Sequence, residues 1–341
     1  MRKLLALGMS LVLAVGLTAC GKEEVTTPTT PETTTDATTT DATTTDATTD
    51  TAATSDIKVG VILKTLSSEY WGYVAAGVKQ AGVDLGVTVD LQGPASETSY
   101  DEQNNMIETM LSSDYDAIVI SPLQPDSVVS VLGDTTTPIL FVDTDAPFDK
   151  KLSYIGTGNK EAAYLGGEYA AKQAGEGAKA VIIGGVQGNT TSDAREAGFR
   201  EALEANGVTV EATQYAEGLA DKASSIMENL LTSLNNDIDI VVCNNDDTAA
   251  GASRALQQAG LTDVIVIGFD GIQAGVQNVI DGTFSATVAQ SPYNMGYMAV
   301  EKAVAVANGE TIDASIDTGA TVVTADNAQA YLDELKSVLG Q

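Results

Sequence analysis

The sequence predicts an α/β protein with two doubly wound parallel sheets, each covered by helices. The chain has 341 residues, of which 43% are apolar, and this is enough material for two buried cores. After residue 56, short β-branched runs alternate with amphipathic stretches of helical period, which is the pattern of parallel strands joined by helices. These runs fall into two successive sets, so we expect two lobes.

The expected strands of the first set are residues 57–63, 87–91, 117–120 and 139–142, with helices over residues 70–85 and 100–111. The expected strands of the second set are residues 178–184, 208–215, 238–243, 264–269 and 285–289. Helices over residues 193–205, 221–234, 248–259 and 272–280 connect this second set. Right-handed crossovers then build one sheet from each set.

Residues 1–19 have the features of an export signal. Two basic residues precede an apolar stretch over residues 4–17, which is too short to span a bilayer comfortably. Residues 17–21, Leu-Thr-Ala-Cys-Gly, resemble the bacterial lipobox and make Cys20 the expected lipidation site, with palmitate among its acyl groups. An ordinary secretory signal with an incidental cysteine is the alternative.

Residues 20–55 predict a lipidated cysteine followed by a disordered spacer. About half of the residues after Cys20 are threonine, and Thr-Thr-Thr-Asp-Ala occurs three times between Thr33 and Ala47. Such a composition cannot form a core. We expect the segment to hold the folded body away from the membrane.

The composition argues against several classes of function. The formal net charge is −30, so nucleic acid would be repelled. The chain contains no histidine, which removes the commonest general base and metal ligand, and we expect no metal, no cofactor and no catalytic residue. With Cys20 lipidated, Cys243 is the remaining thiol; it lies in an apolar strand, which favours an inert core residue.

Polar residues follow most of the expected strands. These clusters are Lys64-Thr65, Asp143-Thr144-Asp145, Asn244-Asn245-Asp246-Asp247, Asp270-Gly271 and Gln290. In doubly wound sheets, ligands bind beyond the carboxyl ends of the strands. Each cluster is therefore a candidate for one shared binding cleft.

The folded body, from about Ile57 to Leu339, resembles the type I periplasmic binding proteins of the ribose and galactose class. The resemblance rests on residues 61–66 with Tyr70-Trp71, on residues 194–199, on Asn244-Asn245-Asp246 and on residues 266–271. It implies two lobes joined by a hinge of three crossing strands, with crossings near Gly156, after Gln290 and near Thr318. The expected domains are residues 56–157 with 291–318, and residues 158–290 with 319–341.

The same resemblance implies the roles of the site residues. Asp143 and Arg195 would hold the hydroxyls of a sugar ring, and Asn245, Asp270 and Gln290 would add hydrogen bonds from the second lobe. Tyr70 and Trp71 would stack on the sugar face, and Lys64 would lie at the cleft rim. The alternatives are structural: the two aromatic residues could plug the helix against its sheet, Asn245 or Asp270 could cap a helix, and Arg195 could form a surface ion pair.

Some residues depart from the ribose-binding pattern. The pattern has an Asp-Arg pair where this sequence has Asp143-Thr144, so the fixed guanidinium is lost. The stretch near Gly218 lacks an expected aromatic residue, and Tyr215 is its candidate replacement. Residues 92–94, Gln-Gly-Pro, are similar to relatives that bind rhamnose or furanosyl signalling molecules, which leaves the ligand open.

The resulting prediction is a monomeric solute receptor, lipid-anchored at the extracytoplasmic face of the cell membrane, that captures a small sugar or polyol by hinge closure and delivers it to the permease of an ABC importer. A sensor that reports occupancy to a chemotaxis or kinase receptor is an open alternative. An enzyme on the same scaffold is a weaker one, because the sequence has neither an activated-nucleophile motif nor a phosphate-binding glycine loop.

Overall fold

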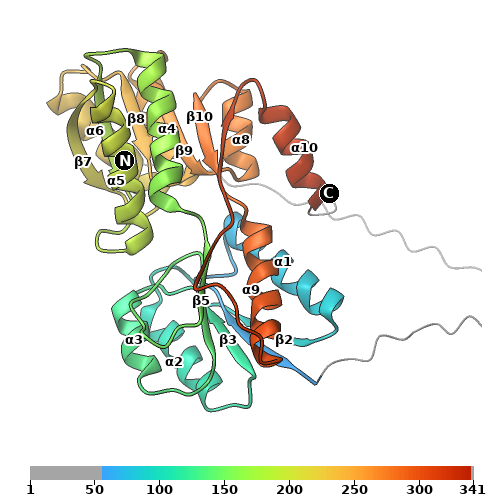
Figure 1. Ribbon diagram of the computed structural model, residues 1–341. Helices are drawn as coiled ribbons and strands as arrows, with labels where there is room; N and C mark the ends of the chain where they lie inside the picture. The colour runs from blue at the N-terminus through green and yellow to red at the C-terminus, as the bar shows by residue number, and fades with distance from the viewer. Residues whose placement is uncertain (1–55, 339–341) are drawn as a thin grey trace, which may run out of the picture. The chain divides into compact units, whose positions relative to one another are not determined.

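A computed structural model describes residues 56–338, which form two α/β lobes (Figure 1). The predicted signal peptide, the predicted lipidation site Cys20 and the threonine-rich spacer lie outside the described residues. Within residues 56–338, no helix combines the length and the apolar character needed to cross a bilayer.

The first lobe is built on a six-stranded parallel sheet with the order β11-β5-β4-β3-β1-β2. Its strands are β1 (Lys58–Ile62), β2 (Thr88–Gln92), β3 (Ala117–Ile120), β4 (Ile139–Val142), β5 (Ser153–Gly156) and β11 (Ser315–Asp317). Its helices are α1 (Glu69–Leu85), α2 (Tyr100–Leu111), α3 (Pro125–Leu132) and α9 (Pro292–Ala307). One apolar cluster packs α1 and α9 against the sheet, and another packs α2 and α3 against it.

The second lobe has the sheet order β12-β10-β9-β8-β6-β7. Its strands are β6 (Lys179–Gly184), β7 (Thr209–Tyr215), β8 (Ile240–Cys243), β9 (Ile265–Asp270), β10 (Ala286–Ala289) and β12 (Thr321–Thr324). Its helices are α4 (Asn159–Ala174), α5 (Thr190–Ala205), α6 (Ala220–Ser233), α7 (Asp246–Gln258), α8 (Gln273–Ile280) and α10 (Ala328–Val338). Helices α4 and α5 cover one face, and α6, α7, α8 and α10 cover the other.

The strand β12 is the exception to the parallel arrangement, because it pairs with β10 in the antiparallel direction. It follows β11 of the first lobe after a turn that contains Gly319, so it enters the second lobe at the carboxyl end of β10 and runs back along it. This is the third crossing between the lobes, after those between β5 and α4 and between β10 and α9. The predicted fold class, two doubly wound lobes joined by three crossings, is confirmed.

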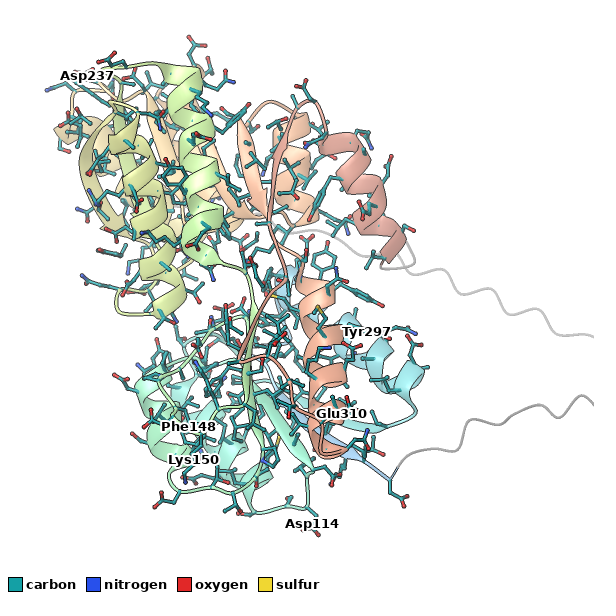
Figure 2. The ribbon with its side chains drawn as sticks, viewed as in Figure 1. Asp114, Phe148, Lys150, Asp237, Tyr297 and Glu310 are labelled. Atoms are coloured by element: carbon teal, nitrogen blue, oxygen red, sulfur yellow. The ribbon has the colours of Figure 1, made fainter. Side chains whose placement is uncertain are left out.

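Local sequence signals explain where the helices begin and end. Ser68 caps α1 by accepting a hydrogen bond from the backbone of Trp71, and α1 ends at Gly86 in the left-handed conformation. The connections from helix to following strand lie at the far ends of the lobes, as Asp114 and Asp237 show in Figure 2. The carboxyl ends of the strands, with their polar residues, therefore lie on the side where the chain crosses between lobes.

Candidate functional site

Two aspartates at the carboxyl ends of strands have strained backbones. Asp143 directly follows β4 and has a φ of 64°, and Asp270 ends β9 with a φ of 111°. Both values lie in the region that favours glycine, at a cost of about 1–3 kcal/mol for each residue. Such strain persists only where surrounding contacts hold the residue, and it occurs most often at functional sites.

In the first lobe, Asp143 is buried in a network of donors. The Lys64 Nζ lies 3.3 Å from Asp143 Oδ2, and the Tyr70 hydroxyl donates to Asp143 Oδ1 at 2.8 Å. The Thr144 hydroxyl donates to Asp143 Oδ2 at 2.8 Å. Burial by itself raises the pKa of Asp143, but the charges of Lys64 and Arg195 and these hydrogen bonds outweigh burial and lower it. Asp143 is therefore held as an ionised acceptor.

In the second lobe, Arg195 of α5 is held by contacts on every side. Its Nε donates to Asn159 Oδ1 at 2.8 Å, and its Nη1 donates to the backbone carbonyl of Asn244 at 2.9 Å and to Asp270 Oδ1 at 3.2 Å. The guanidinium also lies over the Phe269 ring, 3.8 Å from its centroid. Arg195 is only 5% exposed, so the structure does not place it in a surface ion pair.

Asp270 is the acidic residue of this group whose protonation state changes near neutral pH. Gln290 Nε2 donates to Asp270 Oδ1 at 2.7 Å, which adds to the contact from Arg195. Burial raises the pKa of Asp270 to about 7, although Arg195 and the Gln290 hydrogen bond lower it. Asp143 and Glu97 add smaller upward contributions. Near neutral pH, Asp270 is thus poised between its protonated and ionised forms.

Affinity for a ligand whose hydroxyls donate to Asp270 is expected to rise about tenfold between about pH 6 and pH 8, because the ionised fraction of Asp270 rises through its pKa of about 7. Protonation places a hydrogen on one carboxyl oxygen, so the carboxylate accepts hydroxyl donors better than the protonated form does. Stability of the ligand-free protein should change in the opposite direction: the folded pKa is raised above 3.8, so this group's contribution is lost as pH rises toward 7.

Isothermal titration calorimetry across this pH range, with Asp270→Asn as the control that does not titrate, measures the effect on affinity. Affinity that stays flat or falls with rising pH in the natural protein would contradict the assignment of Asp270 as an acceptor.

The two predicted aromatic residues are mostly buried in the first-lobe core. The rings of Tyr70 and Trp71 form an edge-to-face pair with centroids 5.2 Å apart, and their exposures are 9% and 2%. The Trp71 indole nitrogen donates to Glu97 Oε1 at 2.7 Å. Glu97 lies in the loop after β2, and the sequence analysis did not single it out.

The two halves of the site contact each other. The hydroxyls of Thr144 and Thr191 lie 3.0 Å apart across the lobes, and the Thr190 hydroxyl donates to the backbone carbonyl of Asp145 at 3.3 Å. Arg195 lowers the pKa of Asp143, whose charge in turn raises that of Asp270. The structure therefore brings two groups together, one of Lys64, Tyr70 and Asp143, the other of Arg195, Asp270 and Gln290.

Asn245 differs from the other predicted site residues. Its side-chain oxygen accepts a hydrogen bond from the backbone of Thr248 at 2.9 Å and so caps α7. Its amide nitrogen donates to the Gly218 carbonyl at 3.5 Å. The alternative of a helix-capping role is thus observed for Asn245, whereas Asp270 makes no side-chain cap, because Ile272 is the N-cap of α8.

Four buried side-chain polar atoms that directly follow strands have no hydrogen-bond partner among the described residues, and those of Thr157 and Thr318 follow β5 and β11. The other two are the hydroxyl of Ser121, which follows β3, and the side-chain oxygen of Asn244, which follows β8. Buried polar groups are normally satisfied. A hydroxylated ligand would supply such partners, and Ser121 is a residue that the sequence analysis missed.

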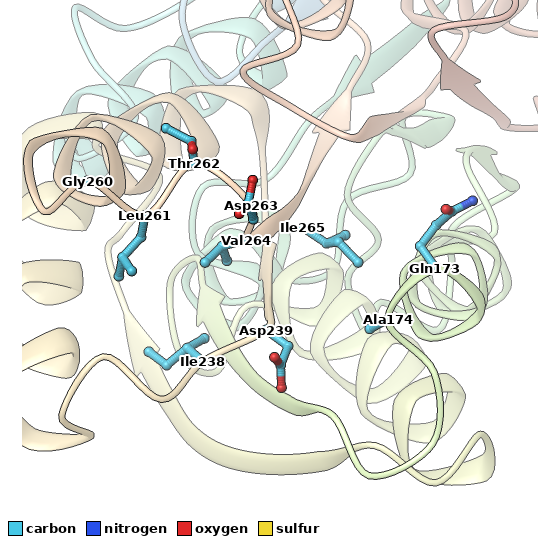
Figure 3. A pocket seen from close by; sticks show the side chains of 10 residues that line it. All are labelled: Gln173, Ala174, Ile238, Asp239, Gly260, Leu261, Thr262, Asp263, Val264 and Ile265. Carbon is cyan, nitrogen blue, oxygen red and sulfur yellow. The ribbon is translucent and has the colours of Figure 1, made fainter.

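Three other features of residues 56–338 bear on catalysis, metal binding or a second binding site. Cys243 is fully buried, and burial raises the pKa of its thiol. No cluster of possible metal ligands is found within these residues. A cavity of about 360 Å³ lies at the amino ends of β8 and β9, lined by Asp239, Asp263 and neighbouring residues (Figure 3), at the opposite end of the sheet from Asp270.

Comparison with known proteins identifies the family. The periplasmic binding protein domain matches residues 59–311. The ribose import binding protein of Escherichia coli is 33% identical over 263 residues, which cover 75% of this chain and 86% of that protein. The D-allose-binding periplasmic protein of Escherichia coli is 32% identical, over 69% of this chain and 80% of that protein.

A solved carbohydrate transporter solute-binding protein of Agrobacterium radiobacter, in complex with D-arabinose, is also similar. It has a TM-score of 0.74 and 31% identity, covering 83% of this chain and 99% of that one. These relatives are binding proteins by name, in agreement with the expectation of a receptor and not an enzyme. The chain belongs to the periplasmic binding protein family and has its type I fold.

Proposed function

We propose that this protein is an extracytoplasmic receptor that binds an uncharged sugar or polyol between its two lobes and delivers it to an ABC permease. The observation that carries the proposal is the convergence of two buried charge networks, one from each lobe, at the carboxyl ends of their strands. Relatives named for binding ribose and allose support it.

The charges of the site favour a neutral ligand. Lys64 lies opposite Asp143, and Arg195 lies opposite Asp270, so each cation already has a carboxylate. A sugar acid would add a negative charge that neither cation is free to neutralise, and a charge without a partner is costly in a buried site. Hydroxyls can instead donate to Asp143 and Asp270 and accept from Arg195 and Lys64.

Closure of the lobes is the proposed mechanism. A ligand that first binds one lobe gains the hydrogen-bonding groups of the other lobe on closure, so it shifts the equilibrium toward the closed form by its differential affinity for the two states. Tyr70 acts through its hydroxyl, which donates to Asp143, and Gln290 orients Asp270. Asn245 does not bind the ligand itself in this proposal; it fixes the Gly218 loop and the start of α7 through its hydrogen bonds.

The cellular setting is part of the proposal. Cys20 is the proposed lipid anchor, with residues 21–55 as the spacer between membrane and receptor. We also propose a monomer with lobes of residues 56–157 with 291–318 and residues 158–290 with 319–341.

Thermal-shift screening of the full chain tests the proposed ligand class. D-ribose, D-allose, D-arabinose, D-fucose and myo-inositol form the neutral set, and D-gluconate and D-galacturonate form the matched acidic set. A neutral ligand at about 1,000 times its Kd stabilises by about 4 kcal/mol, which raises Tm by roughly 8 °C or more. Larger shifts with the sugar acids, or none with any neutral compound, would refute the proposal.

A further inference from the structure

One carboxylate connects the two lobes away from the charge networks. Glu69 is the first residue of α1 in the first lobe, and its Oε1 accepts a hydrogen bond from the backbone nitrogen of Gln273 at 2.7 Å. Gln273 is the first residue of α8 in the second lobe. The same Glu69 oxygen accepts from the Tyr73 hydroxyl at 2.8 Å, one turn along α1.

Glu69 provides the hydrogen-bond acceptor that the N-terminus of α8 lacks in its own sequence. The N-cap of α8 is Ile272, which makes no side-chain capping hydrogen bond, and the first amide groups of a helix have no acceptor within the helix. An anionic oxygen at this end satisfies an amide and interacts favourably with the helix dipole. The acceptor comes from the other lobe, so the cap exists only while the lobes are in contact.

The segment capped in this way also carries Asp270. Ile272 is 6% exposed, and its side chain packs in the first-lobe apolar cluster although its backbone belongs to the second lobe. Behind the segment, Asp246 Oδ2 accepts from the Ile272 backbone at 3.0 Å, and Asp246 Oδ1 accepts from the Thr287 hydroxyl at 2.6 Å. The buried Asp246 thereby fixes residues 270–273 to the second lobe, so these residues move with it.

We propose that Glu69 is an interlobe latch, a positioning residue that stabilises the closed arrangement by capping α8 and so presents Asp270 to the ligand without contacting the ligand itself. Its effect on ligand affinity rests on the proposed receptor function, whereas its effect on the contact between lobes does not. Glu69 also meets a like charge in the second lobe, because burial and then the charges of Glu69 and Glu97 raise the pKa of Asp247.

Hydrogen–deuterium exchange of the full chain reads the latch directly, with or without ligand. In Glu69→Ala we expect the amides at residues 273–276 to exchange about tenfold faster, because the acceptor for Gln273 is lost. Peptides from β9 should be unchanged. Glu69→Gln, which keeps a neutral acceptor oxygen, should lie between the two. Glu102→Ala is the matched control, since Glu102 lies in the first turn of α2 and accepts from the Ala95 backbone nitrogen within the first lobe.

Surface plasmon resonance with the neutral sugar that gives the largest thermal shift measures the effect on binding. Glu69→Ala should weaken Kd about tenfold, mainly through faster dissociation. Unchanged exchange at residues 273–276 would overturn the latch, and so would faster exchange with unchanged Kd. If no sugar binds, the receptor proposal fails while the exchange measurement still decides whether Glu69 joins the lobes.

Discussion

Arg195→Ala is expected to weaken the affinity for a neutral sugar at least 100-fold. The substitution removes ligand donors and the partner of Asp270, and it also removes the contacts to Asn159 and Asn244. Each charge-assisted hydrogen bond lost to the ligand contributes about 1.5–3 kcal/mol, and about 2.7 kcal/mol corresponds to 100-fold in Kd. Without the guanidinium, Asp270 should also be more completely protonated at neutral pH.

Calorimetry with the best neutral sugar measures this loss. Arg200→Ala is the matched control, because Arg200 lies on the same helix α5 but is about a third exposed and pairs only with Glu196 and Glu204 among charged residues described. Its removal should change Kd less than twofold, since exposed ion pairs contribute little. Similar affinity in Arg195→Ala and Arg200→Ala would remove Arg195 from the binding site.

Gly77→Ala is expected to destabilise the first lobe by about 3 kcal/mol, because it forces α1 away from α9. A Cβ at Gly77 would lie 2.0 Å from the backbone oxygen of Tyr293, so the clash cannot be relieved by rotating a side chain. The corresponding fall in Tm is roughly 6–12 °C. The two helices depend on this close approach on both sides, since a Cβ at Gly296 of α9 would also lie 2.0 Å from a backbone oxygen, that of Val74.

Gly72→Ala, on the same helix α1, is expected to stabilise the protein instead of destabilising it. Gly72 is exposed, and a Cβ there would meet nothing within 4 Å, so alanine should stabilise by about 0.5–1 kcal/mol through helix propensity. Differential scanning calorimetry of both variants separates a packing effect from a general response to alanine. Equal shifts of the same sign would contradict the close packing of α1 and α9.

Several elements could be predicted because their signals are local. Strands over residues 117–120 and 139–142 and the helix over residues 100–111 were predicted with the observed bounds, since a short apolar run between turn residues has few other solutions. Helix α4 was not predicted, because its alanine and glycine residues give little periodic contrast. Gly166 and Gly167 lie there against Val288 and Ala202, so their small size serves contacts made by the tertiary fold.

The sequence by itself determined the fold class and, through the rule that ligands bind beyond strand ends, the candidates Lys64, Asp143, Asp270 and Gln290. Only the tertiary structure decided how these charges are paired. Arg195 and Asp270 are 75 residues apart in sequence and 3.2 Å apart in space, and Glu69 meets Gln273 across the lobes. Hydrophobic period and turn residues act over a few positions, whereas ion pairs, burial and the resulting pKa values depend on which distant segments the fold brings into contact.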